Sequence, residues 1–176
     1  MLRIIAYKQS SLSYILMNHF SNCEKKIGRE DIAKMEKKLS ITLPDDFVSH
    51  YLQFNGGTPE KSWWEDDEDF EPLEVAGFKP FVYNSQTNDD PRSLIDGCYI
   101  NMLDREVIPK NLLPFANDWG GNFFCLDLDN YSIVYFATDS FDEDLTMQEN
   151  HTKLQRYLTN SFSNFVNGLV TEEHLS

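Results

Sequence analysis

The sequence predicts a single α+β domain, in which a largely antiparallel or mixed sheet is flanked by an N-terminal helix pair and a C-terminal helix. Three observations predict this fold. Apolar residues recur at helical spacing between residues 29 and 54, short aromatic-rich runs follow between residues 78 and 137, and helical spacing returns after Ser161. The 176 residues contain no internal repeat and no Pro/Gly/Ser-rich linker, and this length is typical of one domain.

The helix pair is predicted from two neighbouring segments. In residues 29–40, an apolar stripe is formed by Ile32, Met35 and Leu39, while acids in the first turn and lysines in the last complement the helix dipole. A second helix begins at Pro44, which suits a first helical position, and ends at Asn55-Gly56-Gly57, because Asn and Gly tolerate the left-handed conformation that follows a helix. Its buried face is predicted to consist of Phe47, Tyr51 and Phe54.

Four strands are predicted after the helix pair, with a tight turn at 118–121 and a hairpin turn at 129–132. Both faces of the third strand are apolar, so we expect it to be central and covered by helices on at least one side. A further helix is predicted over residues 91–104, although Gly97 weakens it. The four strands are Phe78–Tyr83, Leu112–Ala116, Asn122–Leu128 and Ile133–Ala137.

The chain closes with a short helix. Ser161 is a good N-cap, and the apolar residues after it follow helical spacing. Residues 1–27 are interpreted as an N-terminal extension, packed or partly flexible, and residues 28–176 as the domain itself. Met17 is an alternative start of the protein.

The charge of the chain is strongly negative and unevenly placed. Fifteen Lys and Arg against 29 Asp and Glu give a formal charge of −14, and residues 1–38 alone carry +4. This balance disfavours direct binding to nucleic acid or an anionic membrane, and it favours a basic protein partner. No apolar run approaches the ~20 residues that span a bilayer, and no signal peptide is recognised. The three cysteines are widely spaced, which indicates reduced thiols in the cytoplasm.

Catalytic and metal-binding motifs are missing from the sequence. The four histidines have no close metal-ligand spacing, and neither a nucleophile elbow nor a P-loop is present. Cys125 lies in an apolar strand, where a buried and inert thiol is expected. A hydrolase with paired carboxylates is a rival hypothesis, but 29 acids supply candidate pairs without specificity. The sequence therefore predicts a protein that is not an enzyme, with no cofactor and no metal.

The strongest anomaly in the composition is an acidic segment that follows two adjacent tryptophans. It is either a solvated loop or a surface that binds a basic protein, on which aromatic residues provide contact area and acids accelerate encounter. A further alternative is that one or both tryptophans belong to the core. Calcium binding is disfavoured because the loop spacing of a calcium site is absent. Asp142, Glu143 and Asp144 form a smaller acidic cluster. The candidate partner-binding residues are Trp63, Trp64, Glu65, Asp66, Asp67, Glu68, Asp69, Glu71, Asp89 and Asp90.

Several segments, taken in order, resemble the SMI1/KNR4 (SUKH) superfamily. Residues 32–39, 43–47 and 51–57 are similar to its opening helix, its "LP.dy" motif and its "yNGG" motif. Residues 113–128 and 133–136 are similar to its strands, and residues 161–169 to its closing helix. Asn122 departs from the pattern, because an acid is common at that position.

The resemblance implies an α+β fold and the commonest bacterial role of the superfamily. That role is an immunity protein, which binds and neutralises a cognate polymorphic or contact-dependent toxin, often a nuclease. The alternative is an interaction scaffold in signalling or cell-wall regulation, as in fungal relatives. The motif residues of the family are mainly structural, so the resemblance implies no catalytic residues. We expect a cytoplasmic monomer or weak dimer whose partner is a basic toxin domain.

Overall fold

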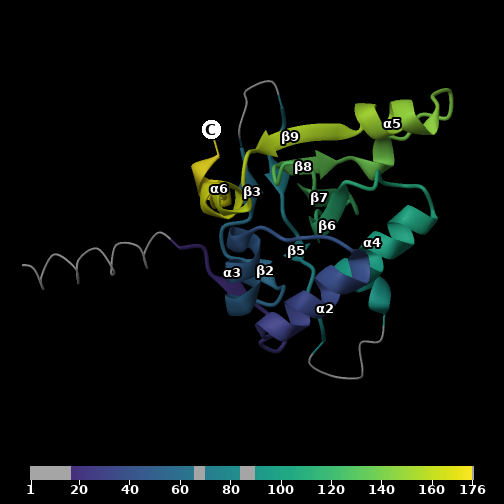
Figure 1. Ribbon diagram of the computed structural model, residues 1–176. Helices are drawn as coiled ribbons and strands as arrows, with labels where there is room; N and C mark the ends of the chain where they lie inside the picture. Colours follow the sequence, from purple (N-terminus) through teal and green to yellow (C-terminus); the bar gives the residue numbers. More distant parts are fainter. Residues whose placement is uncertain (1–16, 66–69, 84–89, 176) are drawn as a thin grey trace, which may run out of the picture.

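A five-stranded antiparallel sheet forms the centre of the molecule (Figure 1). The computed structural model describes residues 17–65, 70–83 and 90–175. The strands follow the order β5-β6-β7-β8-β9, so β7 is central as predicted, and all its residues are buried. The predicted α+β fold is confirmed. The strands are β5 (Gly77–Phe78), β6 (Leu112–Asn117), β7 (Phe123–Asp127), β8 (Ile133–Phe136) and β9 (Gln155–Thr159).

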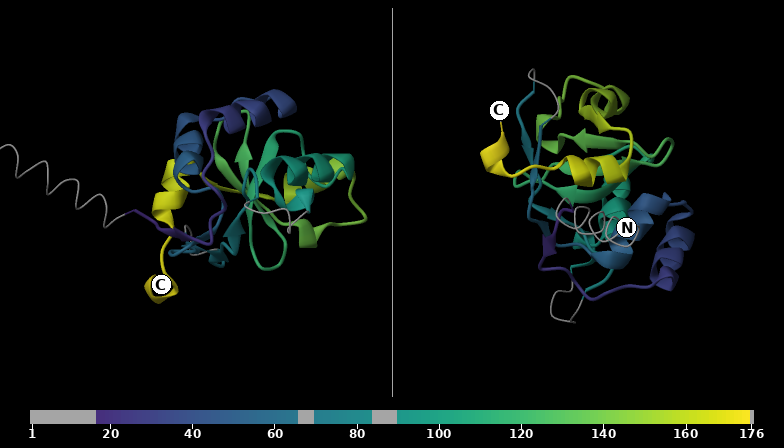
Figure 2. Two further views of the ribbon diagram at one scale, coloured as in Figure 1. Left: turned by 90° about the horizontal axis from the view of Figure 1, so that it is seen from below. Right: turned by 90° about the vertical axis from the view of Figure 1, so that its left-hand side faces the viewer.

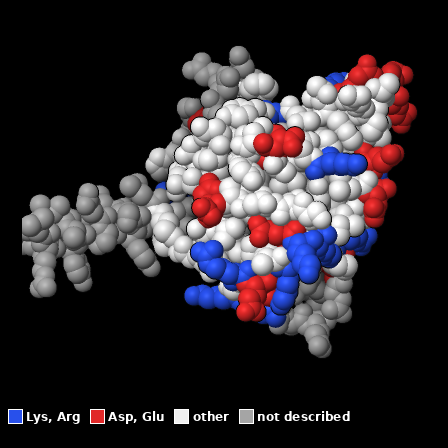
Figure 3. Space-filling view, in the orientation of Figure 1, with Lys and Arg blue, Asp and Glu red and all other residues white. Residues whose placement is uncertain are grey.

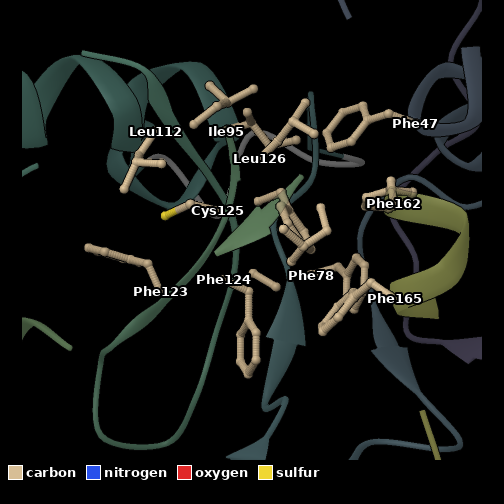
Figure 4. Close-up of a cluster of buried hydrophobic side chains, with 14 of the residues drawn as sticks. Phe47, Phe78, Ile95, Leu112, Phe123, Phe124, Cys125, Leu126, Phe162 and Phe165 are labelled. Atoms are coloured by element: carbon tan, nitrogen blue, oxygen red, sulfur yellow. The ribbon is translucent and has the colours of Figure 1, made fainter. Parts of the chain in front are cut away.

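Helices pack on both faces of this sheet. Successive residues of β7 point to opposite sides, and because they are buried on both sides, each face of the sheet needs a cover. The ring of Phe124 contacts Phe165 of α6 (Phe162–Gly168), which lies beside α3 (Asp45–Gln53). The next residue, Cys125, points toward α4 (Ile95–Asp104) on the other face, as Figure 4 shows. Two further helices are α2 (Arg29–Leu39) and α5 (Met147–Lys153).

The predicted helix pair is confirmed, with one difference at its end. In α2, Ile32 and Met35 are buried, and Ser40 adopts the left-handed conformation that ends the helix. Helix α3 ends at Gln53, and the left-handed residues that follow are Gly56 and Gly57. The predicted left-handed role of Asn55 is wrong, since Asn55 has no positive φ.

Asn55 is instead a buried connector between three segments. Its side-chain amide donates to the carbonyls of Lys25 at 2.8 Å and Val82 at 3.0 Å, and its Oδ1 accepts from the backbone N–H of Phe81 at 2.7 Å. Such contacts satisfy backbone groups that burial would otherwise leave unpaired. Asn55 thereby fixes the chain before α2 against the segment that follows β5.

The predicted strand over residues 78–83 is wrong beyond Phe78. The strand β5 covers only Gly77–Phe78, because Pro80 has no N–H to donate and its carbonyl accepts from Ile95 at the start of α4. The predicted helix over residues 91–104 is divided into the 3-10 turn η1 (Pro91–Ser93) and α4. Gly97 is required here, since a Cβ at this position would lie 1.9 Å from the carbonyl oxygen of Pro91.

Residues 17–27 pack against the domain. Asn18 is buried and exchanges two hydrogen bonds with the backbone of Lys61, and the ring of Phe20 contacts those of Phe54 and Phe78. Strand β1 (Phe20–Ser21) pairs with β2 (Thr58–Pro59) in a small antiparallel sheet. A second pair joins β3 (Trp63–Trp64) and β4 (Leu73–Glu74).

Candidate partner-binding surface

The predicted acidic segment begins at β3, and its two tryptophans have different roles. Trp63 is half-buried and pairs with Val170 through backbone hydrogen bonds. Trp64 is only 7% exposed, and its ring packs against Phe165 in the core. Of the two tryptophans, Trp64 therefore belongs to the core and offers no contact area to a partner, because alternation along β3 turns it inward.

The C-terminal end of this segment is held near the last strand of the sheet. The guanidinium of Arg156, on β9, lies 4.2 Å from the centre of the half-exposed ring of Phe70 and donates to the backbone carbonyl of Glu71 at 3.3 Å. Glu65 is half-buried and Glu71 is exposed. The predicted residues Asp66, Asp67, Glu68 and Asp69 lie outside the described residues.

The second predicted acidic pair lies elsewhere. Asp89 is outside the described residues, and Asp90 accepts two hydrogen bonds from the guanidinium of Arg92, at 2.8 and 2.9 Å. These hydrogen bonds lower the pKa of Asp90. The chain around η1 lies at the opposite end of the molecule from the β3–β4 pair and β9 (Figures 1 and 2). The structure therefore does not bring Asp90 together with residues 63–65 or 70–71.

A different acidic surface is fully described, and we call residues 138–149 the acidic corner. It runs from the 3-10 turn η2 (Thr138–Ser140) into the first turn of α5 and contains no Lys or Arg. In Figure 3, acidic side chains gather at the upper right, over α5, whereas Lys and Arg gather over α2. Phe141 is 48% exposed and Met147 is 38% exposed. The acids of the corner are Asp139, Asp142, Glu143, Asp144 and Glu149.

The acidic corner is folded around one buried side chain. Asn150 has no exposed surface, and its Oδ1 accepts from the backbone N–H of Asp142 at 2.8 Å. Its amide donates to the carbonyls of Asp142, Leu145 and Thr146 at 2.8–3.3 Å. Thr146 and Glu149 also form a capping box at the start of α5. The backbone of the corner is therefore held in one conformation, although it is a loop.

Most acids of the corner keep their charge uncompensated within the described residues. Lys153 lies 2.8 Å from Asp142, and its hydrogen bond lowers the pKa of that carboxyl. The hydrogen bond from Thr146 lowers the pKa of Glu149. The side chains of Glu143 and Asp144 are exposed and form none of the ion pairs seen in that part of the chain. The result is a negative surface that also presents apolar side chains.

A polar cluster joins the acidic corner to the turn between β6 and β7. The amide of Asn122 donates to Asp118 at 3.0 Å and to Asp139 at 3.2 Å, and Tyr135 donates its hydroxyl to Asp118 at 2.6 Å. Burial raises the pKa of Asp118, but the hydrogen bonds from Tyr135 and Asn122 outweigh it, and the net pKa is lowered. Burial and the hydrogen bond to Asp118 raise the pKa of Tyr135. The cluster fixes the position of Trp119 at the tip of the turn, where it is 76% exposed.

The described residues contain no group of three or more His, Cys, Asp or Glu placed to hold a metal ion. Cys125 is fully buried, and this burial raises the pKa of its thiol. The ring of His50 packs against Phe20 and Phe162, and burial lowers its pKa to about 3, which leaves it neutral at pH 7. No helix found in the ranges that the structure covers is both long and apolar enough to cross a membrane.

Sequence reasoning missed the main parts of this surface. Trp119 was assigned only to a tight turn, and the acids after Phe141 were noted without the buried Asn150 that organises them. The signal for the start of α5 was present, since Thr146 and Glu149 have the spacing of a capping box. No sequence pattern, however, places Asn122 beside Asp139, because that contact depends on the register of β7 and β8.

Comparisons with known proteins cover most of the chain. The model of the SMI1 / KNR4 family (SUKH-1) matches residues 26–168. The SPbeta prophage-derived uncharacterized protein YokK of Bacillus subtilis (strain 168) is 25% identical over 155 residues, which cover 81% of this chain and 74% of that protein. A solved structure of a protein from Pseudomonas syringae pv. tomato is 15% identical, with a TM-score of 0.39, and the match covers 70% of this chain and 75% of that one.

Proposed function

Because the chain belongs to the SMI1/KNR4 (SUKH-1) family, we propose that it is an immunity protein that binds a cognate toxin and neutralises it by covering the toxin's surface. The observation that carries this proposal is the family match, which extends over residues 26–168. The prophage origin in the name of the Bacillus relative supports it, since a mobile element that carries a toxin gene benefits from the matching immunity gene.

The charge of the molecule supports a basic toxin as the partner. A formal charge of −14, with acids concentrated outside α2, creates a negative field that accelerates encounter with a positive surface by about 10- to 1,000-fold at low salt. Nucleases bind phosphate through Lys and Arg, so a nuclease toxin offers such a surface. The proposed partner is therefore a basic toxin domain, and a nuclease fits this description.

The proposed mechanism is occlusion, which needs no reacting group on this chain. An interface of roughly 1,600 Å² with well-matched anchors reaches nanomolar affinity, about −12 kcal/mol. The acidic corner supplies exposed apolar area at Phe141 and Met147, surrounded by charges that repel acidic competitors. The protein acts in the cytoplasm, as a monomer or weak dimer, without a cofactor.

Co-expression tests the proposal. The product of the neighbouring gene is induced in a sensitive host, with this protein supplied from a second plasmid, and growth is followed together with co-purification. Growth restored by the protein, with a complex recovered, is the expected result. A neighbouring product that is not toxic, or toxicity that this protein leaves unchanged, contradicts immunity. A stable complex with a non-toxic neighbour instead supports the alternative, an interaction scaffold.

A further inference from the structure

Trp119 is the most exposed of the large apolar side chains in the described residues, at 76%. It lies at the tip of the turn between β6 and β7, with Gly120 and Gly121 after it. Tryptophan is large, and its exposed indole offers more contact area than any other side chain. Tryptophan is also enriched among the few residues that supply most of the binding energy of an interface.

The backbone under Trp119 is held before any partner arrives. The N–H of Asp118 donates to the carbonyl of Asn122 at 3.1 Å, and the N–H of Asn122 donates to Oδ1 of Asp118 at 2.9 Å. Oδ2 of Asp118 accepts from Tyr135 at 2.6 Å, which connects the turn to β8. A side chain on a rigid turn loses less conformational freedom on binding than one on a flexible loop.

The turn is continuous with the acidic corner. Asn122, three residues after Trp119, contacts Asp139 at 3.2 Å and accepts from Thr138 at 3.2 Å. Phe141 follows two residues after Asp139, and the exposed acids Glu143 and Asp144 come after Asp142. An exposed indole thus lies on a segment that is hydrogen-bonded to a negative surface with its own apolar side chains.

We propose that Trp119 is the anchor of the toxin interface and inserts into an apolar pocket of the toxin that is bordered by Lys and Arg. This inference rests on the proposed function. The occupant is a basic protein, because the turn itself carries Asp118 and is hydrogen-bonded through Asn122 to Asp139 of the acidic corner, which has no Lys or Arg between residues 138 and 149. In this arrangement, the acids of the corner orient the toxin and the indole holds it.

The test measures the affinity of the purified toxin for this protein and for three variants. We expect Trp119→Ala to weaken binding by at least about 30-fold, mainly through faster dissociation. Trp119→Phe is expected to fall between it and the wild type, because it keeps part of the aromatic area. Tyr157→Ala is the matched control, since Tyr157 is an aromatic residue on β9 that is 60% exposed, and its affinity should match the wild type.

Two readouts separate this inference from the proposed function. If the wild type restores growth and Trp119→Ala binds the toxin as tightly as the wild type does, the anchor is wrong while immunity stands. If the wild type neither binds nor protects, both proposals fall. Thermal unfolding of each variant accompanies the binding data, and Trp119→Ala should unfold at the temperature of the wild type because the side chain is exposed. Equal losses of affinity in Trp119→Ala and Tyr157→Ala also overturn the anchor.

Discussion

Asn122 shows how one neutral side chain joins two carboxylates. Its amide donates to two carboxylates, Asp118 and Asp139, at 3.0 and 3.2 Å. The superfamily pattern that the chain resembles commonly has an acid at this position, which here would place a third carboxylate against the other two. The amide therefore relieves a repulsion that an acid would create.

We predict that Asn122→Asp destabilises the protein by roughly 2 kcal/mol at pH 7, because two donated hydrogen bonds are lost and like charges approach. Repulsion raises the folded-state pKa of the introduced carboxyl above its unfolded value. The penalty is therefore present at neutral pH, decreases as the pH falls through the raised pKa, and is smallest below about pH 4. Urea unfolding of variant and wild type at pH 7 and pH 4 measures it.

Asn164→Asp is the control for this prediction. It also removes a donated hydrogen bond, from its amide to Oδ1 of Asn160 at 2.7 Å, but at an exposed position in the first turn of α6, where a negative charge is stabilised. Its free energy of unfolding should stay within about 0.5 kcal/mol of the wild type. A loss in Asn122→Asp that does not depend on pH would contradict the electrostatic explanation.

At the residue scale, the sequence predicted which side chains are unusual but not which way they point. The pair Trp63-Trp64 was identified as exceptional, yet Trp64 lies in the core beside Phe165. A two-residue strand alternates like any other, but its phase depends on its partner β4 and cannot be read from the sequence. Asn55 and Asn150 were missed as buried connectors because their partners are backbone groups, which every sequence contains.

At the element scale, helix α4 begins with an unusually close contact. A Cβ on Gly97 would lie 1.9 Å from the carbonyl oxygen of Pro91 and 2.6 Å from its carbonyl carbon. The glycine thus allows η1 to fold back onto the first turn of α4. Glycine within a helix costs about 1 kcal/mol relative to Ala, and the packing of η1 on α4 offsets this cost.

We predict that Gly97→Ala destabilises the protein by about 2–3 kcal/mol, because the backbone at Pro91 must move and the gain in helix propensity is smaller than that loss. Gly77→Ala is the matched control, since a Cβ there would meet only the carbonyl oxygen of Gly57, at 3.8 Å. We expect it to stay within about 0.5 kcal/mol of the wild type in chemical denaturation. Equal behaviour of the two variants would show that the contact with Pro91 has no energetic weight.

Association rates distinguish the acidic corner from the acidic segment that follows Trp64 as the surface that attracts the toxin. Glu143→Lys with Asp144→Lys should slow association with the toxin by about tenfold at low salt and reduce its salt dependence. The same charge change at Glu172 and Glu173, exposed in η3 (Glu172–His174), should slow association less, because these residues lie outside the corner. Association rates of the wild type and both variants, measured between about 50 and 500 mM salt, test this difference.

Reversal of Asp66, Asp67 and Asp69 to Lys tests the segment that the sequence favoured. If this variant slows association and the double variant of Glu143 and Asp144 does not, the acidic corner is excluded. The acidic segment that follows Trp64 is then the docking surface. If only the variant of the corner slows association, the segment contributes solubility alone. Loss of rate in both variants, greater than in the η3 control, places both on the path of encounter.

At the element scale, strong periodicity predicted well and polar elements did not. Helices α2, α3 and α6 follow apolar stripes and were predicted within a few residues of their ends. Helix α5 has no apolar stripe, and strand β9 carries Arg and an exposed Tyr, so both were missed. Their stability comes from tertiary contacts, through Asn150 and through pairing with β8, which the local sequence does not encode.

At the scale of the whole molecule, charge and shape support one way of acting. Basic side chains gather over α2 and acidic ones over α5, so the protein presents different faces to a charged partner (Figure 3). We propose that the protein inhibits by occupying a surface of the toxin.

A stoichiometric titration distinguishes occupation of a surface from catalysis by this chain. Purified protein is added in steps to a fixed concentration of the toxin, well above the dissociation constant, and the residual toxin activity is measured at each step and again after prolonged incubation. Occupation of a surface predicts that activity falls linearly, reaches its minimum at one equivalent and does not change with time. Progressive inactivation of the toxin by much less than one equivalent would contradict the claim, because it would show that this chain acts as a catalyst.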